Sequence, residues 1–145
     1  MKIAISGSTG LIGKALSGRL RAAGHETVAL VRSESPANDP TRCWWQPDSG
    51  LRQPEKLHGA EAVVHLAGRG IADHRWSDRE KALLRSSRVD ATERLCHSLL
   101  QLPVPPRTFV SASAVGIYGD CGEATVNEGH PPGNDFLSRL AVDWE

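Results

Sequence analysis

A glycine-spaced turn directly after the first apolar segment constrains the fold of this chain most strongly. Residues 2–6 predict a short buried strand, residues 7–13 hold three glycines in a G-x-x-G-x-x-G spacing, and residues 11–23 follow a helical apolar rhythm. The apolar positions of this predicted helix are Leu11, Ile12, Ala15, Leu16, Leu20 and Ala23. Gly24 suits the left-handed conformation common just past a helix end, and residues 25–31 predict a second buried strand. Together these segments predict a strand–helix–strand unit, the context in which a glycine fingerprint is informative.

The glycines of this turn have a physical use in binding phosphate. A pyrophosphate must approach the first turn of the helix, where free N–H groups and the helix dipole favour negative charge. A Cβ at Gly7 or Gly10 would obstruct that approach, and Gly13 would let the helix pack close to the strand. The predicted nucleotide-binding residues of the turn are Gly7, Ser8, Thr9, Gly10, Leu11, Ile12 and Gly13. The alternative is a flexible glycine loop that binds no ligand.

The end of the second strand bears on the choice of cofactor. An NAD site places Asp or Glu there to accept a hydrogen bond from the ribose 2′-hydroxyl. Here Arg32 and Ser33 follow the strand, and the first carboxylate is Glu34. Because a guanidinium can hold a 2′-phosphate, the sequence favours NADP(H) over NAD(H). The alternative is a solvated arginine at the end of a strand.

A third buried segment, residues 62–68, predicts a parallel strand beside the first one, at the point where nucleotides bind in doubly wound sheets. The end of this segment, at Leu66, Ala67 and Gly68, would leave room for the cofactor because Ala67 and Gly68 are small. Arg69 follows in position to meet phosphate or substrate. His65, among apolar neighbours, is interpreted as a hydrogen-bonded core histidine rather than a catalyst.

The other segments complete a doubly wound α/β fold with a parallel sheet of strand order 3-2-1-4-5. Prolines interrupt residues 32–59, so we expect only a short strand at 42–45 and no full helix there; its Trp pair is expected to pack on the sheet. Ser77 and Glu80 form a capping-box pattern that opens one helix reaching Leu102. A strand at 108–113 and a final helix at 135–145 follow.

Composition limits the classes of function. The 145 residues carry 17 basic and 17 acidic side chains, which argues against nucleic-acid or membrane-surface binding. We expect one dinucleotide-binding domain over residues 1–145, incomplete at its C-terminus because the last helix lacks a capping signal. The N-terminus lacks a secretory pattern, and Cys43, Cys96 and Cys121 have no metal-ligand spacing, which fits a reducing cytoplasm and no metal site.

Several segments resemble the extended short-chain dehydrogenase/reductase superfamily. They are Gly7–Gly13, His65–Gly68, and Ser111–Ser113 with Tyr118-Gly119. The chain more narrowly resembles the NAD-dependent epimerase/dehydratase branch of nucleoside-diphosphate-sugar epimerases. That likeness rests on Gly-Ser-Thr-Gly-Leu-Ile-Gly, on Ser86–Val89 with Thr92, and on Asp135–Leu137 with Trp144-Glu145. It covers the whole chain but only the N-terminal portion of such a protein.

The resemblance implies site residues, with one departure. Ser113 or Ser111 matches the hydroxyl that binds the reacting oxygen, and Ser113 is preferred. The family's Tyr-x-x-x-Lys is absent, because Phe136 and Leu140 stand at those positions. Arg88, assigned to the cofactor site, occupies the place of the family's helix asparagine.

The proton donor is therefore open. Tyr118 would serve only if its hydroxyl reached the nicotinamide, and Glu123, Glu128 and Asp135 are further candidates.

Three functions remain open from the sequence. The first is an NADP-dependent oxidoreductase or epimerase-like enzyme acting by hydride transfer on a small molecule, either a nucleotide sugar or a carbonyl compound. The second is a non-catalytic NADP(H)-binding redox sensor, and the third is a degenerate nucleotide-binding fragment. A homodimer through the helix at residues 77–102 would follow the family, although the pattern equally fits a core-facing helix.

Overall fold

The computed structural model describes residues 1–145. Its contacts divide the chain into two compact units, Met1–Ser111 and Ala112–Glu145, which are described separately.

The first unit is built on a six-stranded sheet of order β4-β3-β2-β1-β5-β6. Its strands are β1 (Lys2–Ser6), β2 (Glu26–Val31), β3 (Arg42–Gln46), β4 (Gly50–Leu51), β5 (Ala60–His65) and β6 (Thr108–Ser111). Every pairing is parallel except that of β4 with β3. The predicted order of the five parallel strands is confirmed, and the short antiparallel β4 at the edge was not predicted.

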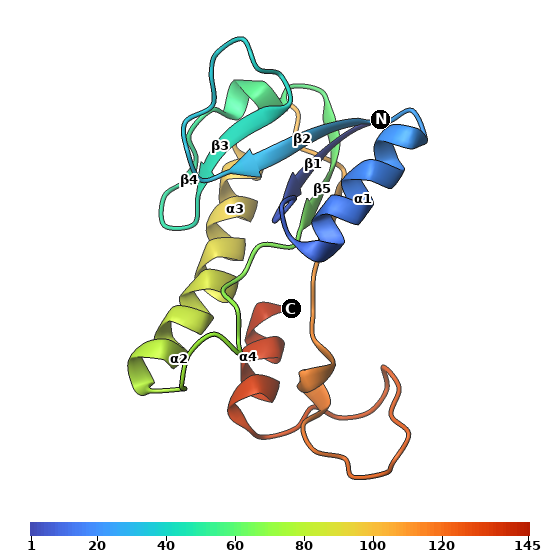
Figure 1. Ribbon diagram of the computed structural model, residues 1–145, viewed down its shortest axis with the longest axis vertical. Coiled ribbons are helices and arrows are strands. Elements are labelled where there is room, and N and C mark those ends of the chain that lie inside the picture. The colour runs from blue at the N-terminus through green and yellow to red at the C-terminus, as the bar shows by residue number, and fades with distance from the viewer. The chain divides into compact units, whose positions relative to one another are not determined.

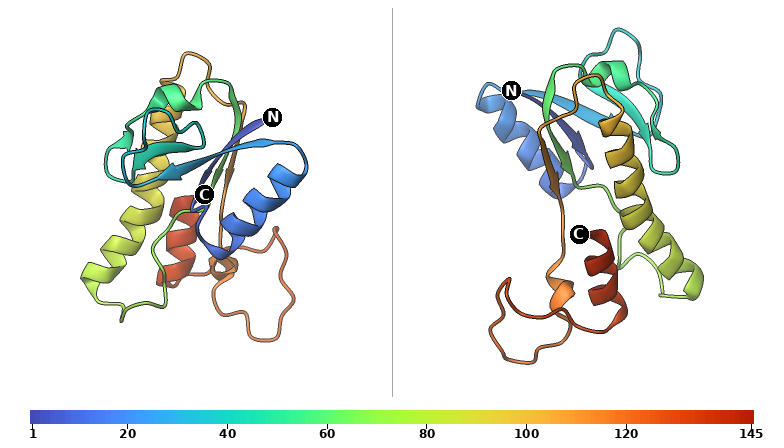
Figure 2. Two further views of the ribbon diagram at one scale, coloured as in Figure 1. Left: turned by 45° about the horizontal axis from the view of Figure 1, so that its top comes forward. Right: turned by 180° about the vertical axis from the view of Figure 1, so that it is seen from behind.

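Helices cover both faces of this sheet, which confirms the doubly wound fold. The helix α1 (Leu11–Ala22) packs Leu16 and Leu20 against Ile3 and Ile5 of β1. The opposite face of the sheet packs on α3 (Ala91–Leu100), and Figures 1 and 2 show α1 and α3 on opposite sides. This second layer holds most of the core and includes residues Ala4, Val28, Leu30, Cys43, Trp45, Val63, Leu95 and Leu99.

The apolar stripe predicted for α1 is wrong at its start. Leu11 and Ile12 are 91% and 67% exposed, whereas Gly13 and Ser17 are the buried residues of this helix. Leu11 and Ile12 form the first turn of α1, directly after the glycine turn, and neither belongs to the core cluster against which Leu16 and Leu20 pack. Only the later turns of α1 pack on the sheet.

The helix predicted over residues 77–102 is interrupted. It consists of α2 (Asp78–Arg85), a π-helical segment (Ser86–Asp90) and α3. The capping box is only half formed, because the Ser77 hydroxyl accepts from the Glu80 N–H at 3.3 Å while the Glu80 carboxylate binds Arg69 instead. A π segment is uncommon and occurs frequently at functional sites.

The connection between β2 and β3 contains no helix, as expected from its prolines. Between β2 and β3, residues 32–41 form only turns and irregular structure. A short 3-10 helix at Pro54–Leu57 follows later, after β4. Trp45 packs in the core at 2% exposure, which confirms the packing role expected for it, and Trp44 lies under the Arg52 guanidinium, 5.6 Å from the ring centroid. The face of β2 and β3 on the α1 side therefore has no crossover helix over it.

The second unit contains a 3-10 helix at Val115–Tyr118 and the helix α4 (Phe136–Trp144). Asp135 caps α4, because its Oδ1 accepts from the Ser138 N–H at 2.8 Å. The predicted strand at 108–113 ends at Ser111, and the one at 62–68 ends at His65.

No helix combines the length and apolar character needed to cross a bilayer. All three cysteines are unpaired, and burial raises the pKa of the Cys43 thiol to about 12.

Candidate functional site

The glycine turn closes tightly on itself and on the end of β5. Gly7 has a φ of +67°, and a Cβ there would stand 2.8 Å from the Leu66 carbonyl carbon. A Cβ on Gly13 would stand 2.2 Å from the Gly7 oxygen. Gly13 is thus required by the turn itself, not by packing on the strand as expected. Gly10 is less restricted, since its Cβ would meet only the Gly7 oxygen at 3.3 Å.

The start of α1 presents free amide groups. Gly10 is its N-cap and offers no side chain, and the first turn contains no acidic residue. The Lys14 N–H donates to the Gly10 carbonyl at 2.9 Å. The Gly10 N–H donates to the Gly7 carbonyl at 3.0 Å, whereas the N–H groups of residues 11–13 precede the first intrahelical bond, which is the arrangement that favours an anion at a helix start.

A cleft of about 840 Å³ opens at this turn. It brings together ten of the predicted cofactor residues: Gly7, Ser8, Thr9, Gly10, Arg32, Ser33, Leu66, Ala67, Gly68 and Arg69. Leu11, Ile12, Gly13 and Arg88 do not line it. The cleft is also lined by residues that the sequence did not assign to it: Leu30, Val31, Arg42, Trp45, Pro47, Leu83, Ser86 and Ser87. Ser86 and Ser87 lie in the unpredicted π segment, and the one sequence signal at them is the Ser86–Val89 stretch of the family resemblance.

A buried hydrogen-bond network fixes the end of β5 against β1. The Ser6 Oγ accepts from the N–H groups of Leu66 and Ala67 at 3.0 and 3.1 Å. Its single proton is then directed to the His65 Nδ1, 2.7 Å away. His65 is therefore neutral with its proton on Nε2, and the network holds Leu66 and Ala67 where they meet Gly7.

The His65 ring is a core group, as the sequence predicts. It is fully buried, its Nε2 has no hydrogen-bond partner, and burial lowers its pKa to about 4. The rings of Trp45 and Phe109 lie 5.6 and 6.1 Å from it, centroid to centroid. A neutral imidazole enclosed by two aromatic rings is a structural element and does not transfer protons to a ligand.

Arg69 lines the cleft, but its guanidinium is already engaged. Its Nε and Nη2 donate to the two carboxylate oxygens of Glu80 at 2.5 and 3.0 Å. This hydrogen-bonded pair raises the pKa of Arg69 and lowers that of Glu80. The Arg69 N–H also donates to the Ser87 hydroxyl at 3.2 Å, so Arg69 ties the loop after β5 to the α2 and π segments.

Arg88 supports the same loop. Its Nη2 donates to the Arg69 carbonyl at 2.8 Å, and a Cβ on Gly68 would stand 3.4 Å from its Cζ. Burial lowers the pKa of Arg88. Arg88 thus holds the loop after β5 in place through its hydrogen bond to the Arg69 carbonyl, and its predicted role at the cofactor site stays a prediction.

The two candidate serines lie in different units. Ser111 ends β6 and is in register with His65, at the edge of the sheet where the glycine turn begins. Ser113 lies in the second unit, where its hydroxyl donates to the Glu145 carboxylate. Tyr118 packs its ring against His130, at 5.9 Å between centroids.

The second unit contains no tyrosine–lysine pair on α4. Phe136 begins this helix and Leu140 is buried within it. Asp135, a candidate proton carrier, accepts hydrogen bonds from Ser138 that lower its pKa, and this favours a capping role over proton transfer. No cluster of His, Cys, Asp or Glu is arranged to hold a metal ion.

Comparison with known proteins agrees with this geometry. The model of the NAD dependent epimerase/dehydratase family matches residues 3–144. An epimerase family protein of Mycobacterium bovis is 44% identical over 143 residues, which cover 99% of this chain and 46% of that protein. The chain thus spans about half the length of the curated relatives it matches.

Two solved structures are also similar. The nucleoside-diphosphate sugar epimerase from Corynebacterium glutamicum superposes with a TM-score of 0.82 at 37% identity, over 99% of this chain and 29% of that one. The human epimerase family protein SDR39U1, solved with NADPH, gives a TM-score of 0.80 at 28% identity, over 99% of this chain and 47% of that one. The resemblance predicted from the sequence is confirmed, and the chain belongs to the NAD dependent epimerase/dehydratase family.

Proposed function

We propose that the protein binds NADP(H) in the cleft at the glycine turn, with the pyrophosphate at the start of α1. One observation carries this proposal: the turn and the exposed Arg32 line the same cleft, and no carboxylate stands beside them at the end of β2. Gly7–Gly10 would hold the pyrophosphate and Leu66–Gly68 would border the nucleoside. Arg32 and Ser33 would face the 2′-phosphate. That the human relative was solved with NADPH supports the choice of NADP(H) over NAD(H).

For the whole protein we propose an oxidoreductase or epimerase-like enzyme. When bound, the nicotinamide supplies or accepts a hydride, and this chain's part is to bind and orient the cofactor. A nucleotide sugar or another carbonyl compound is the proposed substrate, supported by the sugar epimerase among the similar structures. Ser111 or Ser113 would hold the reacting oxygen, with Tyr118 as a further candidate.

A specific observation favours a second function. Phe136 and Leu140 replace the tyrosine and lysine that shuttle the proton in the wider superfamily. A protein that binds NADP(H) without turnover would sense the redox state of the pool, and it would need different affinities for the oxidised and reduced forms. Equal affinities for NADP⁺ and NADPH would remove this alternative.

The first experiment is a fluorescence titration of the protein with NADPH and NADH, repeated on Arg32→Ala and on the matched control Arg19→Ala. We expect NADPH to bind at least about tenfold more tightly, or about 1.4 kcal/mol, and Arg32→Ala to remove that preference. Arg19 lies in the last part of α1 and does not line the cleft, so its variant should behave as wild type. Equal binding of both cofactors, or binding of neither, would contradict the proposal.

A second experiment separates the enzyme from the sensor. The full-length protein is incubated with NADP⁺ or NADPH and a panel of nucleotide sugars and carbonyl compounds. Turnover that falls in Ser111→Ala or Ser113→Ala supports the enzyme and identifies which serine acts. We further propose that the protein works in a reducing compartment such as the cytoplasm, which its three unpaired cysteines support. We also propose that it forms a homodimer through α2 and α3.

A further inference from the structure

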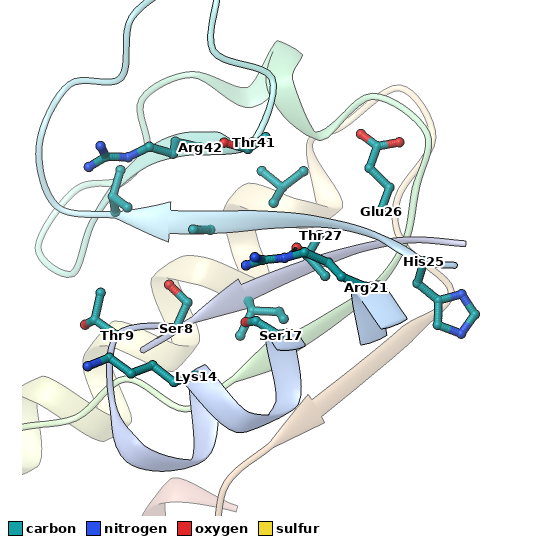
Figure 3. A pocket seen from close by; sticks show the side chains of 14 residues that line it. Ser8, Thr9, Lys14, Ser17, Arg21, His25, Glu26, Thr27, Thr41 and Arg42 are labelled. Carbon is teal, nitrogen blue, oxygen red and sulfur yellow. Dashed lines mark hydrogen bonds between the residues drawn. The ribbon is translucent and has the colours of Figure 1, made fainter. Parts of the chain in front are cut away.

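A second cavity lies on the α1 side of the sheet, where the helix-free connection between β2 and β3 leaves the strands uncovered. Its volume is about 730 Å³, and its floor includes Thr27, Ala29 and Val31 of β2. Figure 3 shows β2 running across this space, with Lys14 and Ser17 of α1 on one side of the strand and Thr41 and Arg42 on the other. Small side chains on the floor leave the room that a crossover helix would otherwise fill.

The end of this cavity nearest the glycine turn is positively charged. In Figure 3 the Lys14 side chain runs back along α1 to Thr9, and Arg42 lies across the end of β2 from them. This direction is the usual one for a long side chain on a helix. Neither Lys14 nor Arg42 forms an ion pair with a carboxylate.

The acidic groups around the cavity are occupied or distant. The Asp39 carboxylate accepts from the N–H and hydroxyl of Thr41 at 2.9 and 2.6 Å. Glu26 lies at the opposite end of the cavity in Figure 3, with its carboxylate 3.8 Å from the Lys2 ammonium. The Asp39 carboxylate interacts electrostatically with Arg42, but neither Arg42 nor Lys14 forms a salt bridge, and both side chains line the cavity.

This cavity and the cofactor cleft meet at the glycine turn. Ser8, Thr9, Val31 and Arg42 line both of them. A group that projects from a nucleotide in the cleft, around the end of β2, would enter the charged end of the second cavity. The 2′-phosphate of an adenosine ribose is such a group, since the end of β2 is where the ribose hydroxyls are recognised in dinucleotide sites.

We infer that Lys14 and Arg42 form a second set of phosphate ligands and, with Arg32, determine the preference for the 2′-phosphorylated cofactor. This inference rests on the proposed function. Lys14 contributes a point charge from α1, and Arg42 contributes a guanidinium from β3, so the phosphate is held from both sides of β2. The hydroxyls of Ser8 and Thr9, at the same junction, complete the polar surroundings.

The chain offers a matched control on the same wall. Arg21 also lines the cavity, but it follows Lys14 by two helical turns, or about 10 Å along α1. Its Nε donates to the Thr27 hydroxyl at 2.9 Å. Removing Arg21 changes the net charge exactly as much as removing Lys14 or Arg42, while leaving the proposed phosphate position intact.

The test measures dissociation constants of NADPH and NADH for wild type, Arg42→Ala, Lys14→Ala and Arg21→Ala. A second pair of probes, 2′,5′-ADP and 5′-AMP, isolates the 2′-phosphate from the nicotinamide half. We expect Arg42→Ala and Lys14→Ala each to weaken NADPH and 2′,5′-ADP by about tenfold, as for a lost charge-assisted contact. NADH and 5′-AMP should change less than twofold in every variant. Arg21→Ala should leave all four ligands unchanged.

The outcomes separate this inference from the proposed function. If wild type prefers NADPH and both variants keep that preference, Arg32 acts alone and the inference is overturned while the proposed function stands. An equal loss in Arg21→Ala would show a general effect of charge and would also overturn it. If inorganic phosphate competes with NADPH as strongly as 2′,5′-ADP does, the cavity is a free-phosphate site, which contradicts the inference. Failure of wild type to bind any of the nucleotides overturns the proposed function and this inference together.

Discussion

The glycine turn in the first unit and the polar groups of the second unit differ in what their hydrogen-bonding atoms do. At the turn, the start of α1 has no side-chain cap and no acidic residue, and the cations Arg32, Lys14 and Arg42 form no salt bridge. In the second unit the polar groups bind one another: Ser113 donates to Glu145, and Asp135 caps α4. The turn leaves hydrogen-bond donors open, whereas these polar groups of the second unit bind one another.

This difference has a physical meaning for function. Open backbone donors and unpaired cations cost little while water solvates them, and they can exchange that water for an anion. The α4 helix of the second unit carries Phe136 and Leu140, which offer neither the phenol nor the amine that a tyrosine–lysine proton shuttle uses. The proposed cofactor binding and the proposed proton transfer therefore depend on different residues of this chain, so variants can test each of them separately.

The largest effect is expected for Gly13→Ala, which would distort the glycine turn. The added Cβ would stand 2.2 Å from the Gly7 oxygen, so the turn or α1 must move. We expect a loss of about 3 kcal/mol in the free energy of unfolding and loss of NADPH binding. Gly18→Ala is the control, because no heavy atom lies within 4 Å of its added Cβ; it should raise stability by about 0.5–1 kcal/mol. Denaturant unfolding and the NADPH titration measure both, and unchanged affinity in Gly13→Ala would contradict the packing argument.

The His65 network predicts a pH dependence of stability in the first unit. Burial lowers the pKa of His65 from 6.5 to about 4. As pH falls below 6.5 the unfolded chain takes up the proton first, so the folded state loses stability down to about pH 4. Between pH 7 and pH 4, wild type should lose about 3 kcal/mol more than His65→Gln, which has no imidazole to titrate. Urea unfolding at several pH values measures this, and parallel curves for the two proteins would refute it.

The smallest effect expected is in the second unit. Asp135→Ala removes the oxygen that accepts from the Ser138 N–H and should cost about 1 kcal/mol of stability, as for other N-caps. We expect NADPH affinity to stay within twofold of wild type. Asp135→Asn keeps a capping oxygen and should retain most of the stability. A large fall in NADPH affinity for Asp135→Ala would show that the two regions are coupled.

Much of the first unit could be predicted from local sequence. The turn at Gly7–Gly13, the left-handed Gly24 and the buried His65 follow from residue types at short spacing, and the parallel strand order follows from the doubly wound topology that the strand–helix–strand unit indicates. These features depend on steric limits and apolar periodicity, which act within a few residues. The capping role of Asp135 went unnoticed, although a carboxylate immediately before a helix carries that signal.

Other features depend on contacts between distant parts of the chain, so the sequence alone left them undecided. Glu80 leaves its capping box because Arg69, from the loop after β5, offers two hydrogen bonds, and the π segment brings Ser86 and Ser87 into the cleft. The sequence alone does not relate Lys14, on a predicted helix, to Arg42, on a predicted strand. The tertiary structure makes them neighbours of one cavity, because the helix-free connection after β2 leaves the space between them open. The sequence by itself determined that this chain forms a doubly wound fold with a glycine turn, and only the packing of distant segments decided which charges face that turn.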